Sequence, residues 1–263
     1  YSDMALGISK MLNIELPLNF FSPYKAKNII EFWRRWHISL STFLRDYLYI
    51  PLGGNRFGDL RRYSNLLTTM LLGGFWHGAG WTFIAWGALH GTYLIINNLW
   101  ISKKLFQIPR PISQAITLLC VVVAWVFFRA PSMAAAIQIL KGMTGLNGVS
   151  ISQNVLSKLP ILTHLGLKTA GFFPNIPTFQ GIGTIATLLG LTCIALFAPN
   201  LVVLLQNEPV ALGTLAFKKE TKKNKDSYFY WQPNWAWASI TALLLVIGTL
   251  HINKESVFLY FQF

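Results

Sequence analysis

Long apolar stretches fill most of this chain, and short polar or basic segments separate them. The longest tract covers residues 64–100, and glycines interrupt it near its middle, around His77. A helix needs about 20 residues to cross the hydrocarbon core of a bilayer, so residues 64–76 alone fall short. The pattern predicts either two spans that meet at the glycines or a partial helix that enters the membrane and turns back. Either version leaves His77 at a break, and such a break predicts a cavity, because non-helical backbone at membrane depth needs surrounding protein or water.

Other segments have clear helical patterns. Apolar runs predict further spans at residues 112–128, 182–205 and 235–250, and an amphipathic helix is expected at 133–143. Residues 28–47 repeat large apolar side chains every three or four positions. That segment carries too much charge to span a bilayer, so it predicts one continuous interfacial or re-entrant helix, which Pro51 and the following glycines end.

Composition supports a membrane protein. Of the 263 residues, 53% are hydrophobic and only 12% are charged, whereas soluble domains carry about 25% charged residues. The net charge of +13 comes from basic residues beside the apolar runs, as in the loops 55–63 and 218–225. Short basic loops of this kind mark the cytoplasmic side of a membrane protein, so nucleic-acid binding is excluded. Cys120 and Cys193 lie inside apolar runs and are interpreted as packing residues.

Histidines are the candidate chemical groups. An ionisable side chain at membrane depth marks a functional site by default, and a neutral imidazole can act as a general base; the alternative for His77 is a hydrogen bond that packs helices together. His37 lies on the aromatic stripe of the interfacial segment, where a packing role is equally plausible. His90 is expected to form an interhelical hydrogen bond. Spacing predicts no metal site and no permanently bound cofactor.

Two long motifs resemble the membrane-bound O-acyltransferase family, in the bacterial branch that contains the membrane subunit for alginate O-acetylation. The first runs Glu31-Phe32-Trp33-Arg34-Arg35-Trp36-His37-Ile38-Ser39-Leu40-Ser41 and continues through Leu44–Asn55. The second is Gly73-Gly74-Phe75-Trp76-His77-Gly78-Ala79. Residues 1–5 and the aromatic end Tyr260-Phe261-Gln262-Phe263 are also similar to that branch.

The resemblance implies an all-α, polytopic membrane protein of this type, with re-entrant or interfacial helices around a tunnel. Residues 1–263 would form one membrane domain, the C-terminal portion of a longer protein whose N-terminal spans are missing. His77 matches the catalytic histidine of the family and His37 its second polar position. We expect substrate or donor contacts from Arg34, Arg35, Trp36, Trp76 and Trp81.

The implied activity is transfer of an acetyl group from a cytoplasmic thioester, acetyl-CoA or an acyl carrier, across the bacterial inner membrane. Hydroxyls of an exported polysaccharide would be the final acceptor, through a periplasmic partner of the serine-esterase type. The chain would contact membrane lipid on its outer faces. Three alternatives stay open: D-alanyl transfer to teichoic acid, a histidine-dependent transporter, and a structural subunit whose partner performs the chemistry.

Overall fold

The computed structural model describes residues 2–146, 150–151, 168–169, 182–205, 211–212 and 231–251. Contacts divide the chain into two units, one of Tyr1–Phe21 with Pro199–Phe263 and one of Ser22–Ala198. The described elements are helical except for two paired strands of two residues each, β1 (Ser150–Ile151) and β2 (Lys168–Thr169). The expected mainly helical fold is confirmed. The basic loop 218–225, His164 and the aromatic end of the chain lie outside the described residues.

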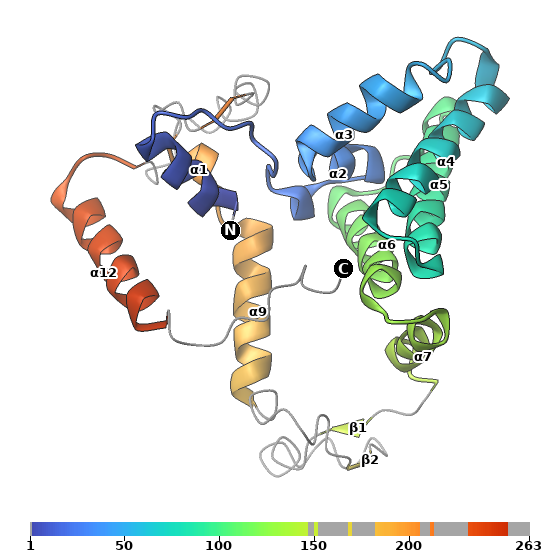
Figure 1. Ribbon diagram of the computed structural model, residues 1–263. Coiled ribbons are helices and arrows are strands. Elements are labelled where there is room, and N and C mark those ends of the chain that lie inside the picture. The colour runs from blue at the N-terminus through green and yellow to red at the C-terminus, as the bar shows by residue number, and fades with distance from the viewer. Residues whose placement is uncertain are drawn as a thin grey trace. The chain divides into compact units, whose positions relative to one another are not determined.

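The larger unit contains both sequence motifs (Figure 1). In chain order its helices are η1 (Pro23–Lys25), α2 (Ile29–Arg35), α3 (Ile38–Leu44), the π-helical η2 (Arg45–Tyr49), α4 (Gly58–His77), α5 (Trp81–Ser102), α6 (Arg110–Arg129), α7 (Met133–Met143) and α9 (Ile182–Phe197). The long apolar tract therefore forms two helices, α4 and α5, which meet at the predicted glycine break. They lie side by side as an antiparallel hairpin whose turn follows His77.

Glycines bring the backbones of α4 and α5 into direct contact. A Cβ added to Gly74 would lie 2.3 Å from the carbonyl oxygen of Phe83, and one added to Gly87 would lie 2.3 Å from that of Met70. Gly91 follows four positions after Gly87, and a Cβ there would lie 2.9 Å from the side chain of Leu67 and 3.2 Å from its Cα. Small residues at this spacing allow close helix packing within membranes. This close crossing of α4 and α5 sets the distance between His77, at the turn, and the residues in the middle of α5.

The core of this unit lies where α2, α4, α5 and α6 meet. Buried positions on α5 recur every three or four residues, so one face of that helix is enclosed. Val121 and Ala124 of α6 are fully buried against this face. The buried set is Ala26, Ile29, Phe32, Trp33, Met70, Trp86, Leu94, Val121 and Ala124.

The predicted continuous helix over residues 28–47 is wrong. α2 ends at Arg35, Trp36 is extended, and His37 adopts the left-handed conformation with φ of 42° before α3 begins. Trp36 stacks on Phe32 and also packs on Trp125 of α6, with ring centroids 5.5 Å apart in both pairs. A regular stripe gives no sign of such a break, because the same spacing continues on both sides of it.

Two further boundaries differ from the sequence prediction. Arg61 and Arg62 lie within α4, because the helix begins at Gly58 and Asp59 pairs with Arg62 at 3.2 Å across its first turn. The predicted span 182–205 is interrupted near Pro199, since proline cannot continue a helical hydrogen-bond ladder. A new short helix, α10 (Leu201–Leu204), then starts with the side chain of Asn200 as its N-cap.

Within the described part of the chain, α6 is the one helix long and apolar enough to cross a membrane by itself. It confirms the helix expected at residues 112–128. The amphipathic helix predicted over 133–143 is also confirmed, as α7. In the smaller unit, α1 (Ser2–Met11) and α12 (Trp235–His251) are the main helices, and α12 matches the apolar run 235–250.

Candidate functional site

His77 is the last residue of α4, and the sequence places it there through the glycine that follows. Gly78 has extended backbone, and a Cβ at this position would lie 2.5 Å from the ring of Phe83. A larger residue would push against that ring, so glycine allows the chain to turn closely past Phe83. The next helix begins three residues later, at Trp81. His77 therefore stands at an open helix end, as its position in the apolar tract predicts.

Aromatic rings surround the half-buried His77 imidazole. Its ring lies edge-on to Trp86 of α5, with centroids 5.2 Å apart at 87°, and to Phe128 of α6, at 5.1 Å and 81°. Its neighbour Trp76 makes a third edge-on contact at 4.9 Å. Such contacts hold the orientation of the ring through packing. The imidazole is thus positioned by three helices in a mainly apolar environment.

His37 lies at the junction of α2 and α3, in a backbone conformation that few non-glycine residues adopt. Strained residues of this kind cluster at functional sites. Burial lowers the pKa of His37 below its ordinary value of 6.5, so its neutral form is favoured. The preceding Trp36 packs on Trp125 of α6, three residues before the Phe128 that contacts His77. Both predicted histidines therefore adjoin the same segment of α6.

His90 has the interhelical hydrogen bond that its sequence position predicts. The indole N–H of Trp33 on α2 donates to Nδ1 of His90 on α5 over 3.2 Å. Because Nδ1 accepts this bond, it carries no proton. The rings of Phe32, Trp86 and Tyr93 complete the enclosure, and only 1% of His90 is exposed. This histidine is a packing element.

The predicted binding residues are dispersed. Arg35 is buried and paired with Glu31, whose Oε1 lies 2.7 Å from its guanidinium, whereas Arg34 is exposed. Of the two arginines, Arg34 alone is directed to solvent. Trp76 meets the His77 ring edge-on but is 66% exposed, and Trp81 is 78% exposed, so neither encloses the imidazole.

Trp86 and Phe128 take that enclosing role, and sequence reasoning missed both. Trp86 follows His77 by nine positions, yet the antiparallel hairpin folds it back over the histidine. Phe128 lies near the end of α6, and its ring also contacts Trp86 and Phe83. A glycine turn that reverses the chain is the signal that could have indicated the first contact.

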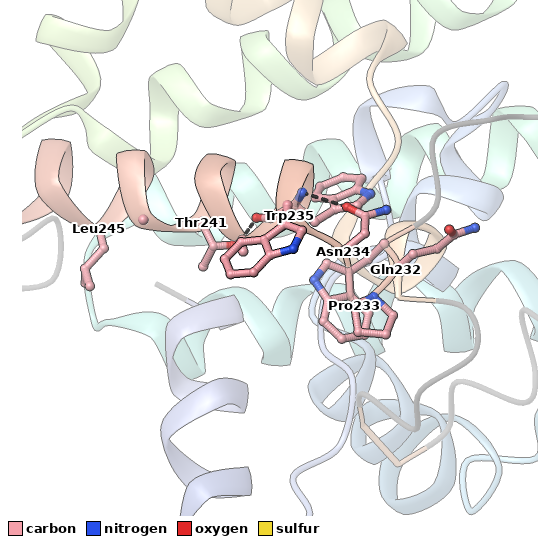
Figure 2. A pocket seen from close by; sticks show the side chains of 10 residues that line it. Gln232, Pro233, Asn234, Trp235, Thr241 and Leu245 are labelled. Carbon is pink, nitrogen blue, oxygen red and sulfur yellow. Dashed lines mark hydrogen bonds between the residues drawn. The ribbon is translucent and has the colours of Figure 1, made fainter.

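A separate apolar pocket lies in the smaller unit, at the beginning of α12. Figure 2 shows Gln232, Pro233, Asn234 and Trp235 around it, with Thr241 and Leu245 further along the helix. The side chain of Asn234 caps α12 by accepting a hydrogen bond from the backbone N–H of Trp237. None of the residues that line this pocket is acidic, basic or a histidine. This pocket therefore lacks a group for proton transfer.

The first half of the chain matches a known protein family. The model of the membrane-bound O-acyltransferase family matches residues 1–136, more than half of the 263-residue chain, including both motifs and α2 to α6. The chain belongs to the membrane-bound O-acyltransferase family.

The names of three relatives refer to peptidoglycan, alginate and teichoic acid. A peptidoglycan O-acetyltransferase of Helicobacter pylori is 42% identical over all of this chain and 46% of its own length. A probable alginate O-acetylase of Pseudomonas fluorescens is 39% identical over all of this chain and 54% of its own length. A teichoic acid D-alanyltransferase of Streptococcus thermophilus is 40% identical over 40% of this chain and 27% of its own length. The chain thus spans about half the length of the relatives that it matches throughout.

Proposed function

We propose that this protein transfers an acyl group from a thioester to a hydroxyl, with His77 as the general base. The observation that carries this proposal is the position of His77: a half-buried imidazole at a helix end, held by the rings of Trp86 and Phe128. The contrast with His90 supports this choice, because that ring is fully enclosed and already hydrogen-bonded.

The proposed chemistry uses one proton acceptor. The neutral imidazole of His77 takes the proton of the acceptor hydroxyl as its oxygen attacks the thioester carbonyl carbon. The carbon–sulfur bond then breaks, and the imidazolium returns the proton to the departing thiolate, which yields an ester and a thiol. General base catalysis of this kind accelerates reactions by about 10²–10⁴-fold.

His37 is the second member of the proposed site. Its favoured neutral form at the α2–α3 junction suits a role in orienting the hydroxyl or the thioester. Arg34, which is exposed one turn before this junction, is the residue we expect to attract an anionic donor. Trp36 and Arg35 would hold the α2–α3 junction in place, since Trp36 stacks on Phe32 and Arg35 pairs with Glu31.

An acetyl group is the proposed cargo. The two O-acetylating relatives align over the whole chain, whereas the D-alanyl-transferring relative aligns over 40% of it. We therefore place D-alanyl transfer second. The donor would be acetyl-CoA or an acyl carrier thioester on the cytoplasmic side, and the final acceptor an exported polysaccharide.

The proposed setting is the bacterial inner membrane, with several spans around a tunnel that carries the acyl group to the periplasm. A periplasmic partner of the serine-esterase type would then deliver it to the polymer. A transporter with a histidine relay would move a substrate without forming a covalent acyl product, and this difference separates the two functions.

The test is made in the full-length protein, in cells that lack the native copy. His77→Ala should abolish O-acetylation of the envelope polysaccharide, measured by mass spectrometry, while membrane insertion stays normal. Gly80→Ala is the matched control at the same turn, because a Cβ there would meet only ordinary contacts of 3.6 Å or more. Normal acetylation in the His77→Ala strain would refute the proposed function.

A further inference from the structure

Trp86 carries a buried hydrogen-bond donor that the fold leaves unused. The residue is 5% exposed, and its indole nitrogen has no hydrogen-bond partner within the described part of the chain. Trp33, its neighbour at 5.9 Å, donates the same group to His90. An unpaired buried N–H is costly to a fold, so of these two adjacent tryptophans Trp86 alone requires an explanation.

The surroundings of Trp86 contain rings on several sides. Its indole lies against His77 at 5.2 Å, His90 at 4.9 Å and Phe128 at 5.5 Å. Tryptophan can only donate a hydrogen bond, and Nδ1 of His90 is already used by Trp33. An acceptor on a substrate held beside His77 would therefore supply this N–H with a partner.

We propose that the Trp86 indole N–H donates a hydrogen bond to the carbonyl oxygen of the acyl group during transfer. This inference rests on the proposed function of His77. When the hydroxyl attacks, the carbonyl π electrons move onto that oxygen, which becomes negatively charged. They return as the carbon–sulfur bond breaks, so the donor stabilises the intermediate without gaining or losing a proton.

The packing of Trp86 suits this role. A donor stabilises a developing oxyanion best when it is fixed in advance in a site that excludes water. Four aromatic neighbours on α2, α4, α5 and α6 fix this indole, and the glycine contacts between α4 and α5 set its distance from His77.

The test compares Trp86→Phe with Trp100→Phe in the purified full-length protein. Trp100 lies 14 residues further along α5, about 21 Å away, and its indole donates to the exposed carbonyl oxygen of Phe106. We expect Trp86→Phe to lower kcat by about 10²–10³-fold, the usual loss for one oxyanion donor, with little change in KM for the thioester. Trp100→Phe should leave both constants unchanged.

A second variant separates the hydrogen bond from the shape of the ring. Site-specific replacement of Trp86 by benzothienylalanine keeps the ring system but puts sulfur in place of the N–H. It should lower kcat as Trp86→Phe does, and it decides the question if the phenylalanine variant fails to fold. An unchanged kcat in this analogue, or a change confined to KM, overturns the inference.

The parallel result for His77→Ala keeps the two proposals distinct. If that variant is inactive while the Trp86 analogue retains full kcat, the role of Trp86 alone is refuted. If the His77→Ala protein is fully active, the proposed function fails first.

Discussion

Two histidines of the α4–α5 hairpin share the same aromatic cluster but differ in their burial and in their hydrogen bonding. His90, in the middle of α5, is 1% exposed and accepts a hydrogen bond from Trp33. His77, at the end of α4, is half-buried and is held by ring contacts at a glycine turn. Trp86 touches both rings. The difference shows that enclosure on all sides makes an imidazole structural, whereas a helix end leaves one free to meet a substrate.

The comparison depends on the close crossing of α4 and α5, which sets the separation of the two histidines. Gly74→Ala should have the largest effect, because its Cβ would overlap the backbone oxygen of Phe83 at 2.3 Å and backbone cannot rotate away. We expect a loss of about 1–3 kcal/mol or more in unfolding free energy, as for overpacked cores, together with loss of acyl transfer. Thermal unfolding in detergent and a transfer assay would measure both.

The adjacent glycine provides the control for that experiment. A Cβ on Gly73 would meet only the end of the Leu44 side chain, at 3.2 Å, and this side chain can move. Gly73→Ala should therefore keep most of the stability and the activity. Equal losses in the two variants would mean that the crossing is not what positions His77.

His90→Phe tests the structural half of the comparison. The substitution keeps an aromatic ring but leaves the N–H of Trp33 buried without its acceptor, which costs about 1–3 kcal/mol. The melting temperature should fall, while transfer activity per folded molecule stays close to normal. His77→Ala should show the reverse, a lost activity in a stable protein.

Removing both partners sharpens this result. In the double variant Trp33→Phe with His90→Phe, no polar atom of the pair is left unsatisfied, so part of the lost stability should return. If the double variant instead loses at least as much unfolding free energy as the two single variants added together, the hydrogen-bond account is contradicted.

Sequence patterns indicated the helices better than the site. Continuous apolar runs located α6 and α12, an amphipathic pattern located α7, and the glycines located the break after His77. The kink at His37 could not be read from spacing, since Trp36 and His37 fit the same stripe whether the helix continues or ends there.

The contacts of His77 were harder to predict for a related reason. Trp76 is its neighbour in sequence but is 66% exposed, because consecutive side chains on a helix point in different directions. Trp86 reaches His77 only through the reversal of the chain at residues 78–80. Which residues of the two helices come into contact depends on where the helices cross. The close approach of Gly74 to Phe83, which sets this crossing, is seen only in the three-dimensional structure.

The smallest expected effect concerns α2, which supplies Trp33 to the buried histidine. Its N-cap, Asn28, accepts a hydrogen bond from the backbone N–H of Glu31 over 2.8 Å, and Glu31 in turn accepts one from the backbone N–H of Lys27. Asn28→Ala should cost about 1 kcal/mol, the usual loss for an N-cap, whereas Asn28→Ser should restore most of it. Because α2 holds Trp33 against His90, the loss should appear in thermal unfolding in detergent, with transfer activity in the folded protein largely kept. A large fall in activity without a change in stability would show instead that the cap acts on the α2–α3 junction at His37. In that case α2 would serve the reactive site as well as His90, and burial alone would not separate the structural histidine from the reactive one.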